Sequence, residues 1–177
     1  MRLFAAIVPP EEVLDSLEAA VLRSGAHSAD DAAVRWNARE LWHLTVAFYG
    51  DDDLPARTLR LGERLRGIPA PRLRVVGAGT FPGVLWAGIA GDTASDSAAV
   101  EVVAAAGTGD DRLPFHPHLT IARWRGRRRP PAIGRVADAL ADYAGPSWVA
   151  HEVVLFGSEL SHHGPSYTAQ RHFPLAE

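Results

Sequence analysis

A short pattern occurs twice in the chain and constrains its fold more than any other feature of the sequence. Each copy reads His-Leu-Thr, then a β-branched apolar residue and alanine, and the copies lie within 42–48 and 117–123. Each copy follows a predicted strand and a predicted helix. Before the first copy these are strand 2–8 and helix 11–23, and before the second they are strand 84–90 and helix 95–106. The repeated strand–helix–strand order is typical of a diverged internal duplication.

The duplication predicts an α+β fold with two pseudo-symmetric lobes, each an antiparallel sheet with flanking helices, around a central cleft. A chain of 177 residues, of which 47% are hydrophobic and 22% charged, is long enough to bury a sizeable core. No linker-like shift in composition separates the halves, so we expect residues 1–177 to form a single two-lobed domain. The remaining predicted elements are helix 54–66, strand 72–76, helix 131–143, and strands 149–156 and 167–173.

Strand geometry brings the polar residues of each copy to one face. Side chains in a strand point alternately to opposite faces, so residues two apart share a face. His43 therefore lies beside Thr45, and His118 beside Thr120. The apolar residues between them point the other way and can anchor both strands in a core. We expect the two His/Thr faces to line the cleft.

Two histidines and two threonines suit the opening of a cyclic phosphate. One histidine can take a proton from water while the other gives a proton to the leaving ribose oxygen, because imidazole titrates at about 6.5. Threonine hydroxyls can donate hydrogen bonds to phosphoryl oxygens as charge builds on them. A single His-x-Thr is more often a strand histidine bonded to a neighbour, and it is the duplication that favours a catalytic pair.

These motifs and the segments around them resemble the two-histidine phosphoesterase superfamily, specifically bacterial RNA 2′,3′-cyclic phosphodiesterases, first named 2′-5′ RNA ligases. The similar segments are 2–7, 42–50, 84–88, 115–123, 158–160, Tyr167 and 173–175. The resemblance implies a metal-independent hydrolase, without a cofactor, that converts RNA 2′,3′-cyclic phosphate ends to 2′-phosphates. It also implies that His43 is the general acid, His118 the general base and Arg123 a phosphate ligand.

Arg123 does not follow the alternation of its strand. Strict alternation puts it on the face opposite His118 and Thr120, so the strand must end, twist or bulge near Ala122 for Arg123 to reach a phosphate. Among the aromatic residues, Tyr167 is a candidate to stack on a nucleobase. Phe48 could do the same, but alternation gives it the parity of the core residues, and we leave it out of the predicted site.

Two other groups of side chains allow different interpretations. His116 could join His118 and His43 in a three-histidine metal site. Pro117 between the first two and the lack of nearby acids argue against it, and we predict no bound metal. Arginines between 123 and 129 form either a solvated loop, as most charge runs do, or a phosphate-facing rim.

Composition narrows the possible functions and partners. The chain has no cysteine, which excludes disulfides, thiolate zinc sites and cysteine nucleophiles, and its net charge of −3 gives no global field that favours nucleic acid. No apolar run approaches the roughly 20 residues of a membrane helix. We expect a cytoplasmic monomer that acts on RNA or oligonucleotide ends carrying a cyclic phosphate. Alternatives are 2′-5′ RNA ligation, a small-molecule cyclic nucleotide phosphodiesterase, and a non-catalytic RNA-end binding module.

Overall fold

The computed structural model describes residues 1–26, 33–91, 93–107, 115–161 and 164–177. Its elements, in chain order, are β1 (Arg2–Ile7), α1 (Glu11–Arg23), β2 (Val34–Trp36), the 3-10 turn η1 (Arg39–Leu41), β3 (Leu44–Asp51), α2 (Leu54–Arg64), β4 (Arg72–Phe81), β5 (Val84–Gly91), α3 (Thr93–Ala106), β6 (His118–Trp124), α4 (Pro131–Ala139), β7 (Ala144–Val149), β8 (Glu152–Ser161) and β9 (Gly164–Pro174).

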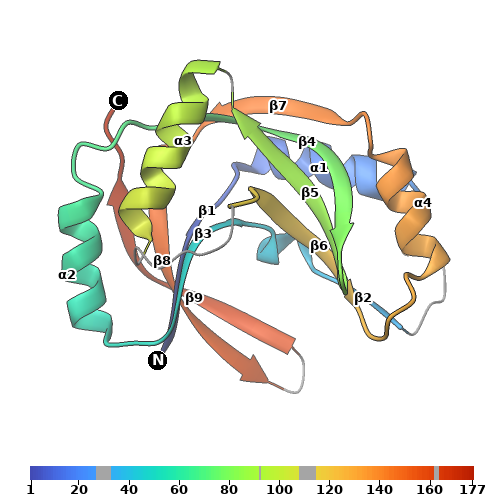
Figure 1. The fold of residues 1–177 in the computed structure, drawn as a ribbon, viewed down its shortest axis with the longest axis horizontal. Helices are drawn as coiled ribbons and strands as arrows, with labels where there is room; N and C mark the ends of the chain where they lie inside the picture. Colours follow the sequence, from blue (N-terminus) through green and yellow to red (C-terminus); the bar gives the residue numbers. More distant parts are fainter. Residues whose placement is uncertain (27–32, 92, 108–114, 162–163) are drawn as a thin grey trace.

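The strands form one curled antiparallel sheet in the order β7-β4-β5-β6-β3-β1-β8-β9, with β2 paired to β6 off this path (Figure 1). The order is symmetric about its middle, because β6-β5-β4-β7 on one side mirrors β3-β1-β8-β9 on the other. The α+β fold with two similar antiparallel lobes is therefore confirmed. The lobes are continuous with each other, since β3 and β6 pair at Leu44 and Leu119.

The two halves of the chain exchange strands between the lobes. The first half supplies β1 and β3 to one lobe, but its last strand, β4, pairs with β5 and β7 in the other lobe. The second half supplies β5 and β6, and then returns β8 to pair with β1. Because each lobe needs a strand from the other half of the chain, we propose that residues 1–177 fold as one domain.

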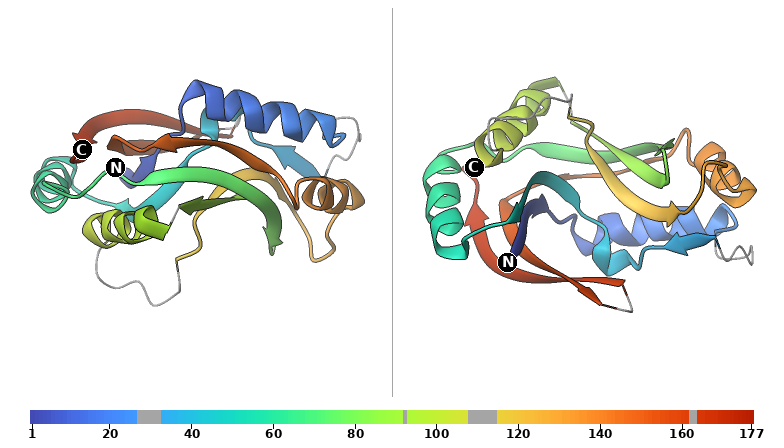
Figure 2. Two further views of the ribbon diagram at one scale, coloured as in Figure 1. Left: turned by 90° about the horizontal axis from the view of Figure 1, so that it is seen from above. Right: turned by 60° about the horizontal axis from the view of Figure 1, so that its bottom comes forward.

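The hydrophobic core holds the inner faces of the two motif strands. Leu44, Val46, Leu119 and Ile121 are each at most 4% exposed, which fixes the face on which the neighbouring polar residues must lie. The apolar stripe of α1 is buried as its spacing predicts, and α1 lies along the sheet while α2 and α4 sit at opposite ends of the molecule (Figure 2). Burying one such aliphatic side chain stabilises the fold by about 1.5–3 kcal/mol.

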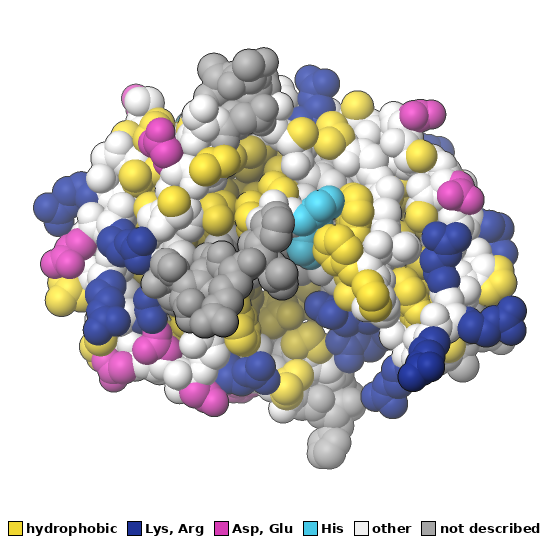
Figure 3. Space-filling view, viewed as in Figure 1, with side chains coloured by type: hydrophobic (Ala, Val, Ile, Leu, Met, Phe, Trp, Pro, Cys, Tyr) yellow, Lys and Arg dark blue, Asp and Glu magenta, His cyan; other side chains and the backbone are white. Residues whose placement is uncertain are grey.

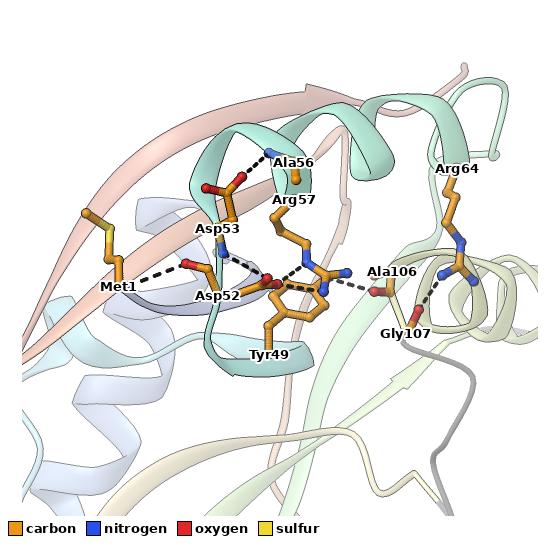
Figure 4. A network of polar contacts seen from close by, with 9 residues as sticks. All are labelled: Met1, Tyr49, Asp52, Asp53, Ala56, Arg57, Arg64, Ala106 and Gly107. Carbon is orange, nitrogen blue, oxygen red and sulfur yellow. Dashed lines mark hydrogen bonds and ion pairs between the residues drawn. The ribbon is translucent and has the colours of Figure 1, made fainter.

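A polar network fixes the end of β3 to its neighbours (Figure 4). Asp53 caps α2 by accepting a hydrogen bond from a first-turn backbone N–H at 2.9 Å. Asp52 accepts a hydrogen bond from Arg57 at 2.6 Å, and the Arg57 guanidinium lies 4.0 Å from the centre of the Tyr49 ring. The Tyr49 hydroxyl in turn donates to the carbonyl of Ala106 at 2.7 Å. The network ties the strand that follows His43 to both α2 and the end of α3.

The predicted strand 149–156 is confirmed over 152–156, but its start is wrong, because the structure divides this region between the two lobes. β7 ends at Val149 and pairs with β4, whereas β8 starts at Glu152 and pairs with β1. The predicted helix 131–143 also ends early, since α4 stops at Ala139 and the carbonyl of Tyr143 accepts a hydrogen bond from the backbone of Gly77 in β4. Long-range pairing with β4 decides both boundaries.

Candidate functional site

All six residues predicted for the site line one pocket of about 190 Å³ at the junction of the lobes. They are His43, Thr45, His118, Thr120, Arg123 and Tyr167. The other described residues of the lining are Phe4, Arg35, Asn37, Leu41, Phe48, Ser158 and Pro165. The space-filling view shows histidine side chains open to solvent near the middle of one face, bordered by hydrophobic side chains, with arginines lower on the same face (Figure 3).

The junction of the two lobes brings the motifs face to face. β3 and β6 are antiparallel, and their register partners are Leu44 and Leu119, the middle residues of the two His-Leu-Thr copies. Both leucines are buried, so the flanking histidines and threonines project to the pocket side. In an antiparallel ladder, the residue before one partner faces the residue after the other. By register, each histidine therefore lies beside the threonine of the other copy.

A bulge in β6 brings Arg123 to the pocket. Leu85 of β5 pairs with Ala122 and the next residue pairs with Thr120, so Ile121 is the extra residue of the ladder. Ile121 and Ala122 are consequently both buried, and Arg123 after them is exposed and lines the pocket. The irregularity that the sequence requires near Ala122 is present, and its physical form is a β-bulge.

The same device acts in β3, where the sequence analysis did not predict it. Ala5 of β1 pairs with Ala47 and the next residue pairs with Thr45, which makes Val46 the extra residue. Phe48 thereby leaves the core parity, is 57% exposed and lines the pocket. The expectation that Phe48 belongs to the core is wrong. Phe48 and Arg123 occupy the same place in the two copies, five residues after the histidine, so the duplication itself carried the signal.

His43 lies in an aromatic environment. Its ring centre is 5.0 Å from that of Phe4 and 5.3 Å from that of Tyr167, whose ring meets it edge-on. Burial lowers the pKa of His43 to about 4, although a hydrogen bond to the backbone of Leu41 acts in the opposite direction and His118 adds to the lowering. In the unliganded protein His43 is neutral at pH 7.

His118 has both an aromatic and a charged neighbour, and the Phe81 ring meets it edge-on with 5.2 Å between the ring centres. Burial lowers the pKa of His118, and the nearby charges of His116 and Arg123 lower it further, against a hydrogen bond to the backbone of His116 that raises it. The Nδ1 atom lies 2.6 Å from the carbonyl oxygen of His116. A carbonyl can only accept, so Nδ1 carries the proton and Nε2 of the neutral ring is free to accept one.

Two residues of the pocket were missed because β2 was not predicted. Arg35 is the register partner of Arg123 across β2 and β6, so the two guanidinium groups come from directly opposite positions. Asn37 follows β2 and donates a side-chain hydrogen bond to the carbonyl of Thr120 at 3.0 Å. Its backbone N–H also donates to the carbonyl of Ile121, the bulge residue, at 2.8 Å. A three-residue strand leaves too short a pattern in the sequence to be recognised.

The structure leaves the other candidate residues outside this pocket. The ring of His116 lies 6.1 Å from that of His118 but is not part of the lining, and the described residues hold no group of three or more histidines or acids suited to a metal ion. Arg127, Arg128 and Arg129 are exposed and line none of the described pockets.

Known proteins are similar to the chain in sequence and in fold. A family model described as the 2′-5′ RNA ligase superfamily matches residues 8–159, which is most of the chain and includes both His-Leu-Thr copies. The chain belongs to the 2′-5′ RNA ligase superfamily. Tyr167 lies beyond the segment that the superfamily model matches, whereas Phe48, Arg123 and Arg35 lie within it.

Members of named activity and a solved structure are similar to the chain over most of its length. A protein of Aeropyrum pernix named RNA 2′,3′-cyclic phosphodiesterase is 32% identical over 139 residues, which are 72% of this chain and 78% of that protein. A protein of the same name from Methanothermobacter thermautotrophicus is 32% identical over 157 residues, covering 82% and 84%. The crystal structure of TT0787 of Thermus thermophilus has a TM-score of 0.74 at 26% identity and covers 99% of this chain and 98% of its own.

Proposed function

We propose that the protein hydrolyses 2′,3′-cyclic phosphates at RNA ends and leaves a 2′-phosphate. The observation that carries the proposal is the meeting of two His-Leu-Thr strands at one pocket, with both histidines, both threonines and an arginine in its lining. This set contains an acid, a base and donors for a phosphoryl group. The names of the relatives from Aeropyrum pernix and Methanothermobacter thermautotrophicus support the same reaction.

In the proposed reaction His118 takes a proton from water through Nε2, and the water oxygen attacks the phosphorus. The bond from phosphorus to O3′ breaks as His43 gives its proton to that oxygen, and the phosphate stays on O2′. Thr45, Thr120 and Arg123 donate hydrogen bonds to the phosphoryl oxygens, which gather negative charge in the transition state. Both histidines have a hydrogen bond to the backbone, His118 to His116 and His43 to Leu41, so each neutral ring can accept a proton at its other nitrogen. The choice of His118 as the base follows the family resemblance.

The proposed acid needs a proton that the free protein does not hold. Burial keeps the pKa of His43 near 4, so the ring is neutral before substrate binds. A bound phosphate anion favours the imidazolium form, and it acts on both histidines. Burial is the first cause that lowers the pKa of His118, and the charge of Arg123 adds to the lowering. We propose that the bound phosphate brings a proton to His43, and that the Arg123 charge helps to keep His118 neutral.

The aromatic lining provides a place for the terminal base. Phe48 is exposed beside the pocket, and Tyr167 stands edge-on to His43. Stacking of a base on an aromatic side chain is worth about 1–3 kcal/mol and tolerates every base. We propose that these two rings hold the nucleoside whose ribose carries the cyclic phosphate, on the side of the pocket next to the acid.

Product identity tests the proposed function. The wild-type protein is incubated with RNA ending in a 2′,3′-cyclic phosphate, in EDTA, and the ends are separated by chromatography against 2′- and 3′-phosphate standards. We expect conversion to the 2′-phosphate at a rate that EDTA does not change. A 3′-phosphate product, binding without turnover, or activity lost on chelation and restored by a divalent ion would contradict the proposal.

We further propose that the protein works as a cytoplasmic monomer. Within the described residues no helix is long and apolar enough to cross a membrane. Light scattering on a sizing column should give the mass of one chain at micromolar concentration, and twice that mass would contradict the monomer.

A further inference from the structure

A second groove opens from the pocket along β2 and β6. Its described lining is Ala33, Val34, Arg35, Pro82, Gly83, Val84, Arg123, Trp124 and Arg125. Arg35 and Arg123 belong to both linings, so the groove continues from the site of the cyclic phosphate. At about 700 Å³ against about 190 Å³, it is also the larger space. The proposed reaction leaves this groove without a use.

The charges along the groove are of one sign. Arg35 stands directly opposite Arg123 in the β2–β6 register, and like charges at such positions destabilise a sheet. No acidic side chain occurs among the described residues that line either space, and neither arginine forms an ion pair within the described part of the chain. A bound anion would offset this repulsion.

The position of Arg125 gives the groove reach beyond the first phosphate. It follows Arg123 by two residues of nearly extended chain, a step of about 6.6 Å that keeps both side chains on one side. Arg123 is close enough to His118 to lower its pKa, so the groove lies next to the proposed base. A phosphate held by Arg35 and Arg125 would therefore be a different group from the one between the histidines.

We propose that Arg35 and Arg125 bind a second phosphate group of RNA and thereby select RNA chains over mononucleotides. The inference rests on the proposed function, because it takes the first phosphate to lie between the histidines. Two sources share this chemistry. One is the linkage on the 5′ side of the terminal ribose, and the other is a second strand whose 5′-hydroxyl end takes the place of water beside His118.

The first arm of the test removes one charge from the substrate. A dinucleotide with a 2′,3′-cyclic phosphate is compared with its counterpart that has a neutral methylphosphonate linkage. A charge-assisted hydrogen bond is worth about 10-fold or more in affinity, so the neutral linkage should lower kcat/KM of the wild type about 10-fold. In the double variant Arg35→Ala/Arg125→Ala, the two substrates should agree within about 2-fold.

The second arm measures binding without turnover. A short fluorescent RNA with a 5′-hydroxyl and no cyclic end is titrated with protein by anisotropy, and the double variant should bind it about 10-fold more weakly if the second strand is the source. The matched control is Arg127→Ala/Arg128→Ala, which removes the same charge from exposed neighbours outside both linings. The control should behave as the wild type in both arms.

The second phosphate site is supported if the groove variant, and not the control, loses the preference for the charged linkage in the first arm or binds the 5′-hydroxyl RNA more weakly in the second. The first result identifies the 5′ linkage as the source, and the second result identifies the second strand. Equal effects in the wild type, the groove variant and the control, in both arms, overturn it. Failure of the proposed function looks different, because the wild type would then turn over neither dinucleotide while the anisotropy arm still reports on Arg35 and Arg125.

Discussion

The two copies of the motif share a backbone and differ in what surrounds it. Both place a histidine and a threonine on the pocket face, and both bulge directly after the threonine to turn the fifth residue toward the pocket. That fifth residue is Phe48 in one copy and Arg123 in the other. His43 stands against the rings of Phe4 and Tyr167. His118 stands edge-on to the ring of Phe81 and close enough to Arg123 for its charge to lower the pKa of the histidine, after burial as the first cause. The duplication accounts for the shared geometry, and we propose that the fifth position separates a base-facing side from a phosphate-facing side.

The largest expected effect is common to both copies. His43→Ala and His118→Ala should each lower kcat on RNA 2′,3′-cyclic phosphate by about 10²–10⁴-fold, as is typical for a positioned acid or base. The double variant should lose less than the product of the two, because the histidines act in one step. Steady-state rates of the three variants check this. If the loss in kcat of the double variant equals the product of the two single losses, the histidines do not act in one step.

Stability against acid should differ between the copies. His43 is neutral in the native protein down to a pH of about 4, whereas in the unfolded chain it takes up a proton below about 6.5, so acid favours unfolding. Between pH 7 and pH 4 this histidine should account for a loss of about 2–3 kcal/mol in the free energy of unfolding. Urea titrations give the free energy of unfolding of the wild type and of His43→Asn at each pH. The difference between these two free energies should narrow as the pH falls from 7 to 4. A difference that does not change with pH would contradict the lowered pKa.

His118→Asn is the comparison for that measurement. Burial lowers the pKa of His118 as well, so acid should again reduce the free energy of unfolding. His118 is less deeply buried than His43, and the loss of stability on acidification should therefore be smaller. If acid reduced the stability more through His118 than through His43, His118 would be the more deeply buried of the two histidines, contrary to this account.

The fifth residues should divide phosphate from base. Arg123→Ala should lower kcat/KM by about 10²-fold on every cyclic phosphate substrate, because a charged hydrogen bond to the phosphoryl group is lost whatever the base. Phe48→Ala should cost about 10-fold on nucleoside substrates, and nothing on a ribose cyclic phosphate that has no base. Phe48→Trp is the control that keeps the stacking surface. Equal losses from Phe48→Ala with and without the base would remove its stacking role.

The sequence predicted the paired His/Thr faces, because side chains alternate along a strand and three residues are enough to place the histidine and the threonine on one face. The occurrence of the pattern in two copies made it specific. It also predicted a break near Ala122, since Arg123 had the wrong parity for its expected role. The same reasoning, applied to the equivalent position, would have placed Phe48. Alternation alone did not, because a bulge is set by register against a neighbouring strand.

Long-range pairing explains the remaining differences. Arg35 and Asn37 reach the pocket through β2, whose three residues acquire strand structure from β6 rather than from their own pattern. The division of 149–156 into β7 and β8 likewise depends on which lobe each piece pairs with. The sequence therefore predicts the motif faces, but not the residues that a partner strand delivers to them.

The division of labour between the two histidines is tested most directly by the leaving group. A nitrophenyl phosphodiester releases a group that needs no proton, so the acid is dispensable on it and the base is not. His43→Ala should recover a large part of the wild-type rate on this substrate, whereas His118→Ala should stay as slow as on RNA 2′,3′-cyclic phosphate. Rescue of His118→Ala alone would reverse the two roles, and wild-type rates for both variants on the RNA substrate would contradict catalysis by this pair.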